Sequence, residues 1–95
     1  MDSSPDRPNP LPELDLHGLS GAEAERALAR ELHAWRVRGV RRAVVVTGRG
    51  WGNRAQEPVL RTRIERWLAG PDGQRLGVRT FRRVHREGAL ELEIG

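Results

Sequence analysis

The chain has 95 residues, a formal net charge of +4 at pH 7 and no cysteine. A chain of this length forms one small domain with a modest core, so any chemistry must lie on the surface of that core. The lack of cysteine excludes disulfides, thiolate nucleophiles and zinc–thiolate sites, and it fits a cytoplasmic protein.

Neither a signal peptide nor a membrane span is expected from the sequence. The first residues lack the positive charge and the apolar stretch that a signal peptide carries. The longest purely apolar run, Ala43–Val46, is far too short to cross a bilayer. We therefore expect no membrane partner and a cytoplasmic location.

The basic side chains are all arginines, 17 in number. Residues 13–95 hold 16 of them against 11 acidic residues, so the expected folded part carries a surplus of positive charge. Guanidinium groups match the geometry of phosphate and keep their charge at any physiological pH. The surplus favours a polyanionic partner such as nucleic acid.

The first half of the chain predicts a tail, a strand, a helix and a strand. Residues 1–12 contain four prolines and no apolar periodicity, which is typical of a flexible tail, and the domain is expected over 13–95. Leu14–His17 alternates apolar and polar residues, as a half-buried strand does. Ser20 has the spacing of a capping box, so a helix should begin there and run to about Arg38. The expected buried stripe of this helix is Ala24, Ala27, Leu28, Leu32 and Trp35. Ala43–Val46 reads as a strand covered on both faces.

The second half predicts a loop, a second helix and a hairpin. Residues 47–53 form a glycine-rich loop, and Pro58 fits the first turn of a helix that ends before Gly70 and Pro71. Strands are expected near residues 79–85 and over 89–94, joined by a hairpin. The order β-α-β-α-β-β predicts an α/β two-layer sandwich, with a mixed four-stranded sheet and two helices. Its parallel first pair of strands places His17 and the glycine-rich loop at one edge.

Two local patterns at that edge carry the candidate chemistry. Asp15 and His17 stand two apart on the first expected strand and point to one face, where a carboxylate can orient an imidazole for acid–base catalysis. The alternative is that Asp15 and His17 are simply polar residues on the solvated face of the strand. Glycines on both sides of Arg49 let backbone amides approach a phosphate, although an ordinary strand-to-helix turn has a similar composition. Trp51, in the same loop, either stacks on a base or covers the core.

Taken together, these patterns resemble those of a known family. Leu14–Gly18 reads LDLHG and Thr47–Gly50 reads TGRG, similar to the paired LDLHG and TGxG signatures of the Smr (small MutS-related) domain. Pro58–Leu60 and Trp67–Leu68 are similar to the family's second helix. The resemblance covers nearly all of residues 13–95. It implies a fold similar to the C-terminal domain of translation initiation factor 3.

The resemblance also implies DNA or RNA binding, with endonuclease activity that nicks DNA or cleaves RNA. Carried over to this chain, the catalytic pair is Asp15 and His17. The residues expected to bind nucleic acid or its phosphates are Thr47, Gly48, Arg49, Gly50 and Trp51, the last by stacking. A ribosome or DNA-repair partner cannot be read from the sequence.

Several alternatives remain open at this point. The domain is either a nuclease or a non-catalytic DNA- or RNA-binding module, and a small phosphorylated ligand at the same edge is a third reading. Asp15 is the one carboxylate expected close to the site, with Glu57 a more distant candidate, so the cofactor is unknown and a divalent metal is allowed but not demanded. Four arginines either follow a phosphate backbone or pair across strands with Glu91 and Glu93. They are Arg79, Arg82, Arg83 and Arg86.

Overall fold

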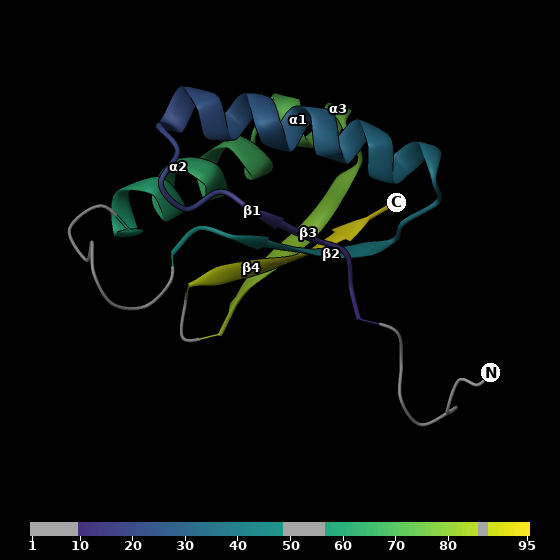
Figure 1. The fold of residues 1–95 in the computed structure, drawn as a ribbon. Helices are drawn as coiled ribbons and strands as arrows, with labels where there is room; N and C mark the ends of the chain where they lie inside the picture. Colours follow the sequence, from purple (N-terminus) through teal and green to yellow (C-terminus); the bar gives the residue numbers. More distant parts are fainter. Residues whose placement is uncertain (1–9, 49–56, 86–87) are drawn as a thin grey trace.

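The computed structural model describes residues 10–48, 57–85 and 88–95, with backbone only at 57 and 58. These residues form a mixed four-stranded sheet and three helices (Figure 1). The elements are β1 (Glu13–Asp15), α1 (Gly21–Val37), β2 (Arg42–Val46), α2 (Glu57–Ala69), α3 (Pro71–Arg75), β3 (Val78–Val84) and β4 (Ala89–Ile94). The strand order is β1-β2-β4-β3, with β1 parallel to β2 and the other two pairs antiparallel. The predicted α/β fold with a mixed sheet is confirmed. None of the described helices is long and apolar enough to cross a membrane.

Helix α1 begins and ends where the sequence predicts. The Ser20 hydroxyl accepts a hydrogen bond from the Glu23 N–H at 3.2 Å, and the Glu23 carboxylate accepts one from the Ser20 N–H at 3.1 Å. These hydrogen bonds lower the pKa of Glu23. At the other end Gly39 takes a φ of +77°, a left-handed conformation that glycine adopts without strain. The capping box therefore fixes the start of α1 at Gly21, four residues after His17.

The core lies between the helices and one face of the sheet. Four of the five predicted stripe residues of α1 are fully buried, and Ala27 packs against them partly exposed. From the sheet, the alternating residues Leu90, Leu92 and Ile94 of β4 point into the same core, as the sequence predicts. The other buried members of the core are Leu16, Ala43, Val45, Leu60, Ile64, Leu68 and Val78.

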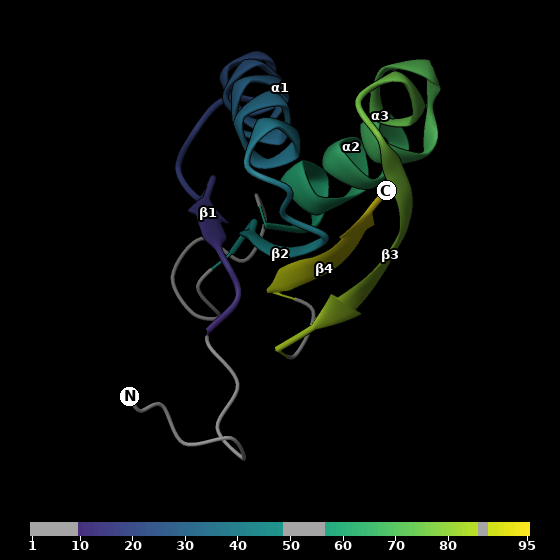
Figure 2. The same cartoon turned by 90° about the vertical axis from the view of Figure 1, so that its right-hand side faces the viewer.

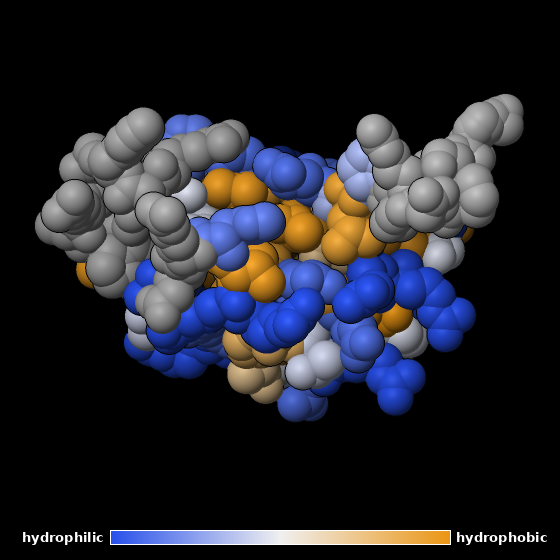
Figure 3. All heavy atoms as spheres, turned by 90° about the horizontal axis from the view of Figure 1, so that it is seen from below, coloured by the Kyte–Doolittle hydropathy of each residue, from blue (hydrophilic) through white to orange (hydrophobic). Residues whose placement is uncertain are grey.

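The prediction that β2 is covered on both faces is wrong. All three helices lie on one side of the sheet (Figure 2), so Val45 is buried in the core whereas Val44 is half-buried. The physical reason is that both helical connections, from β1 to β2 and from β2 to β3, pass over the same face. The opposite face shows an apolar centre bordered by hydrophilic side chains (Figure 3).

The prediction of two helices is also incomplete, because a short third helix follows the second. Pro71 does not simply end α2; it begins α3, where its missing N–H leaves no helical hydrogen bond unmade. Gly73 is buried, and a Cβ at this position would collide with the backbone of Leu68 at the end of α2. The close contact between the two helices therefore depends on a glycine that the sequence analysis did not single out.

The arginines of β3 point to both faces of the sheet. The register of β3 against β4 shifts between Val78 and Thr80, so Arg82 falls beside Glu91 and pairs with it at 3.2 Å. Arg83 lies on the helical face, where its guanidinium donates to both carboxylate oxygens of Glu65 in α2, at 2.6 and 3.1 Å. Arg82 thus follows the cross-strand alternative, Arg83 ties the sheet to α2, and Arg86 lies outside the described residues.

The boundary of the predicted tail falls partly within the described chain. The Pro12 carbonyl accepts a hydrogen bond from the Val44 N–H at 2.8 Å, so contact with the sheet begins at this residue. Residues 1–9 lie outside the described residues, and their flexibility stays a prediction.

The contact between Glu65 and Arg83 predicts a pH-dependent part of the stability. Glu65 is 18% exposed, and the hydrogen bonds from Arg83 lower the pKa of its carboxyl group. Because the folded pKa lies below the unfolded one, the stabilisation is complete above the ordinary value of 4.5 and disappears as pH falls through the folded pKa. Glu65→Gln should therefore reduce the free energy of unfolding by about 1 kcal/mol at pH 7 and by little in acid.

Urea denaturation across pH measures this difference. Glu31→Gln is the matched control, since Glu31 forms no ion pair with another described residue. A Glu65→Gln deficit that is constant from pH 7 to acid would contradict the assignment.

Candidate active site

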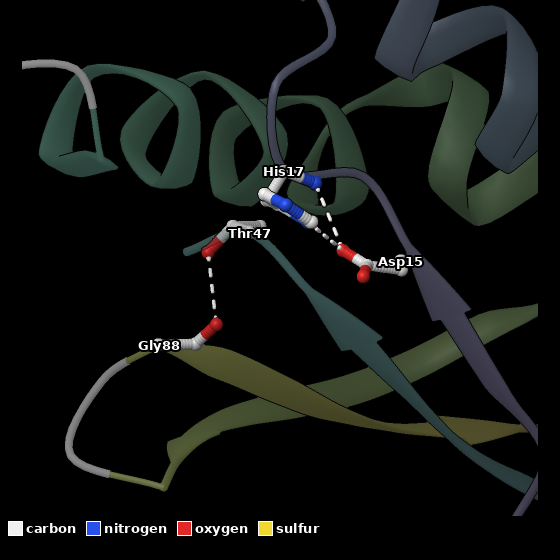
Figure 4. Close-up of polar contacts among 4 residues, drawn as sticks. All are labelled: Asp15, His17, Thr47 and Gly88. Carbon is white, nitrogen blue, oxygen red and sulfur yellow. Dashed lines mark hydrogen bonds and ion pairs between the residues drawn. The ribbon is translucent and has the colours of Figure 1, made fainter. Parts of the chain in front are cut away.

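Parallel pairing brings the ends of β1 and β2 to one edge of the sheet. The register places Asp15 opposite Val46, and the Leu16 N–H donates to the Val46 carbonyl at 2.7 Å, one step beyond the end of β1. The residues that follow, His17 and Thr47, therefore lie beside each other at this edge (Figure 4). The sequence predicts this juxtaposition from the strand–helix–strand order alone.

Asp15 and His17 form a close pair at this edge. Oδ1 of Asp15 lies 2.7 Å from Nδ1 of His17 and also accepts a hydrogen bond from the His17 backbone N–H at 3.1 Å. The side chains are 32% and 51% exposed respectively, so both remain accessible. The sequence predicts that they share a face of a strand. In the structure β1 ends at Asp15, and the turn after it, closed by the Leu19 N–H on the Leu16 carbonyl, brings the imidazole to the carboxylate.

The partner of Nδ1 determines which nitrogen of His17 can react. An ionised carboxylate only accepts hydrogen bonds, so the proton of a neutral His17 must sit on Nδ1. Nε2, on the other side of the ring, then carries the lone pair. A carboxylate that holds an imidazole in one tautomer and one orientation is the arrangement that general-base catalysis uses. The geometry can therefore present Nε2 to an acidic hydroxyl of a bound substrate.

The first two residues of the glycine-rich loop are held by the β3–β4 hairpin. The N–H groups of Thr47 and Gly48 both donate to the carbonyl of Gly88, at 2.9 and 3.0 Å. Figure 4 shows Thr47 beside this carbonyl. Thr47 is only 2% exposed, and its hydroxyl also lies 3.5 Å from this carbonyl. Both backbone N–H groups are therefore engaged within the protein, and in this structure Thr47 and Gly48 fix the start of the glycine-rich loop to the hairpin. The predicted residues Arg49, Gly50 and Trp51 lie outside the described residues.

Gly88 is the site residue that the sequence analysis missed. It was read as part of a hairpin turn, whereas its carbonyl is the acceptor for two amides of the neighbouring loop. A Cβ on Gly88 would stand 3.0 Å from the carbonyl oxygen of Gly48, so any other residue must push the loop away by a few tenths of an ångström. Before it, His85 has a φ of +53°, and its carbonyl accepts from the Gly88 N–H. The signal in the sequence is a glycine directly before an alternating strand.

The described part of the chain contains no group of three or more histidine, aspartate or glutamate side chains placed to hold a metal ion. The polar groups that the described residues bring together at this edge are one carboxylate, one imidazole and a loop fixed by backbone hydrogen bonds. This combination provides an oriented base next to a segment that carries a predicted phosphate-binding arginine.

The domain thus belongs to the class of open α/β sheets that carry their candidate site, here an acid–histidine pair, at the carboxyl ends of parallel strands. The Smr domain family model matches residues 14–90, so the chain belongs to the Smr domain family, whose domains are nucleic-acid-binding modules. No curated protein sequence matches the chain. The predicted family is confirmed, whereas the comparison with translation initiation factor 3 stays a prediction.

Solved structures of other Smr domains share the fold. The Smr domain of Thermus thermophilus MutS2 is 23% identical with a TM-score of 0.70, covering 90% of this chain and 99% of that one. YdaL, a stand-alone small MutS-related protein from Escherichia coli, is 17% identical with a TM-score of 0.71, covering 86% and 63%. The SMR domain of NEDD4-binding protein 2 is 28% identical with a TM-score of 0.63, covering 99% and 94%.

Replacing Gly88 by alanine should displace the glycine-rich loop while the domain still folds. The new Cβ meets a backbone oxygen at 3.0 Å, so the hairpin and the loop must separate by a few tenths of an ångström. We expect about 1–2 kcal/mol of destabilisation, as for other overpacked sites. Amide hydrogen exchange should be faster at Thr47 and Gly48 and unchanged in α1. Unaltered protection at these two amides would show that the contact does not hold the loop.

Proposed function

We propose that this Smr domain binds nucleic acid at the edge formed by the ends of β1 and β2 and that it cleaves RNA there. The observation that carries the proposal is the contact of 2.7 Å between Asp15 and Nδ1 of His17, which leaves Nε2 as the reactive nitrogen. Family membership and the arginine surplus support a nucleic-acid substrate.

The chemistry follows from what one oriented histidine can do to a ribonucleotide. Nε2 of His17 takes the proton of a 2′-hydroxyl, and the oxygen attacks the adjacent phosphorus. The bond from phosphorus to the 5′ oxygen breaks, and that oxygen takes up a proton from solvent. The products are a cyclic phosphate on one fragment and a 5′-hydroxyl on the other. Asp15 stabilises the imidazolium that forms, as a carboxylate does in a catalytic triad.

Charge that develops on the phosphate needs a positive group close by. Arg49 follows the anchored Thr47–Gly48 segment directly in sequence, and its guanidinium is the natural candidate for this contact. The Gly88 carbonyl accepts hydrogen bonds from the amides of Thr47 and Gly48. The residue directly before Arg49 in sequence is therefore fixed to the hairpin. DNA has no 2′-hydroxyl, so the same pair would have to activate a water molecule on a DNA substrate.

Removing the acid–base pair should abolish cleavage without unfolding the domain. Both side chains are accessible and lie outside the core, so the double replacement Asp15→Ala, His17→Ala should leave the thermal melt nearly unchanged. We expect the cleavage rate to fall by about 100- to 10,000-fold, the usual contribution of a general base. Asp15→Asn alone should also reduce the rate, since a neutral amide does not stabilise the imidazolium and can donate to Nδ1, which favours the wrong tautomer. A double variant with full activity would remove both residues from the mechanism.

The products distinguish this route from metal-assisted hydrolysis. RNA should be cut faster than DNA of the same sequence, cutting should persist in EDTA, and the fragments should end in a 5′-hydroxyl and a cyclic phosphate. End-group analysis with and without chelator makes the measurement. Cleavage that stops in EDTA and leaves 5′-phosphates would replace this mechanism by metal-dependent hydrolysis. Binding without cleavage of either nucleic acid would favour the non-catalytic module.

A further inference from the structure

The end of the domain opposite His17 carries a dense group of arginines. It is formed by the C-terminal end of α1, the start of β2, helix α3 and the start of β3, next to the end of β4 (Figure 1, around the label C). The arginines of this end are Arg36, Arg38, Arg41, Arg42, Arg75 and Arg79, and we call them the distal arginine patch. All six are exposed.

Contacts among neighbouring backbone segments make this group one surface. The side chain of Arg36 lies across Gly77 and donates to the Arg75 carbonyl at 3.4 Å. The Gly95 N–H donates in turn to the Gly77 carbonyl at 2.9 Å, and the Arg79 side chain lies against Gly95. The Arg41 carbonyl accepts a hydrogen bond from the N–H of Ile94, the residue before Gly95. Four of the six arginines are therefore connected within a few residues of the end of β4.

The carboxylates at this end neutralise only part of the positive charge. Arg75 pairs with Asp72 at 3.0 Å, and Arg42 pairs with Glu91, which Arg82 also contacts. Glu93 is exposed and lies opposite Arg42 in the register. Within the described residues, Arg38, Arg41 and Arg79 form no ion pair. At the opposite edge, the described charged side chain in contact with His17 is the carboxylate of Asp15.

Local stability explains only some of these arginines. Cations near the C-terminus of a helix interact favourably with its dipole, which accounts for Arg36 and Arg38 at the end of α1. Arg41 and Arg79 lie on the segments that begin β2 and β3, where no helix end requires them. Several exposed positive charges close together repel one another, and an arriving polyanion relieves that repulsion.

We propose that the distal arginine patch is a second contact for the nucleic acid, which binds the phosphates of the strand away from its cleavage point. The inference rests on the proposed function of the His17 edge and adds an anchoring site to it. The 17 residues of α1 separate the two ends by about 25 Å at 1.5 Å per residue. A long strand can reach both ends, whereas a strand of a few nucleotides reaches only one.

The test compares two triple replacements on RNAs of two lengths. The patch variant is Arg38→Gln, Arg41→Gln, Arg79→Gln, and glutamine keeps most of the side-chain length. The matched control removes the same charge from exposed arginines on the helices: Arg26→Gln, Arg30→Gln, Arg66→Gln. Binding is measured by fluorescence anisotropy over a salt series, and cleavage on the same samples. Thermal melts confirm that both variants fold.

For an RNA of about twenty nucleotides, the patch variant should bind at least about tenfold more weakly, with a salt slope lower by about two units. In the control variant, both the affinity for this RNA and the salt slope should fall by less. For an RNA of about four nucleotides, cleavage by the patch variant should equal that of the wild type. Equal losses in both triple variants, or unchanged binding of the long RNA, would overturn the anchoring role. A wild-type domain that binds no RNA at any length overturns the proposed function itself, and that result is distinct from the previous two.

Discussion

Two adjacent strands can run parallel only if the chain returns across the sheet between them, and in this domain α1 makes that return. The return puts α1 on one face and brings the carboxyl ends of β1 and β2 to one edge. The hydrogen bond from the Leu16 N–H to the Val46 carbonyl extends the pairing to that edge. Without the parallel pairing, the ends of β1 and β2 would not meet at one edge, and His17 would not lie beside Thr47. The position of the acid–histidine pair beside Thr47 is thus a consequence of the strand pairing as much as of the LDLHG sequence.

The antiparallel half of the sheet supports the same edge from the other side. Because β4 lies between β2 and β3, its first residue, Ala89, faces Val46 at the end of β2. Gly88, just before β4, therefore lies beside the residues that follow β2, and its carbonyl accepts hydrogen bonds from the amides of Thr47 and Gly48. The parallel strands therefore provide the acid–base pair, and the hairpin provides the support for the loop. Substitutions in the hairpin can act on the site without touching a substrate.

Ion pairs explain where the positive charge of this domain remains unmatched. Glu25 of α1 engages Arg63 of α2, Glu65 of α2 engages Arg83 of β3, and Glu91 lies between two arginines on the uncovered face. These carboxylates join one element to another, and Glu91 also contacts Arg42 of the distal arginine patch. At the end where α1 stops and β2 begins, Arg38, Arg41 and Arg79 form no ion pair with a described residue. Within the described residues, the end that carries the distal arginine patch therefore holds more arginines than carboxylates.

Much of this protein was readable from its sequence, because local chemistry determines local structure. Ser20 and Glu23 fix the start of α1, the alternation from Leu90 to Ile94 fixes which side of β4 is buried, and the spacing of Asp15 and His17 marks the site. Contacts between segments distant in the chain were not readable. The one-sided cover of β2, the dependence of α3 on Gly73, the pairing of Arg83 with Glu65 and the two amides bound by Gly88 all depend on which elements become neighbours. Periodicity reports which side of an element is buried but not what lies against it, and only the tertiary structure decided that.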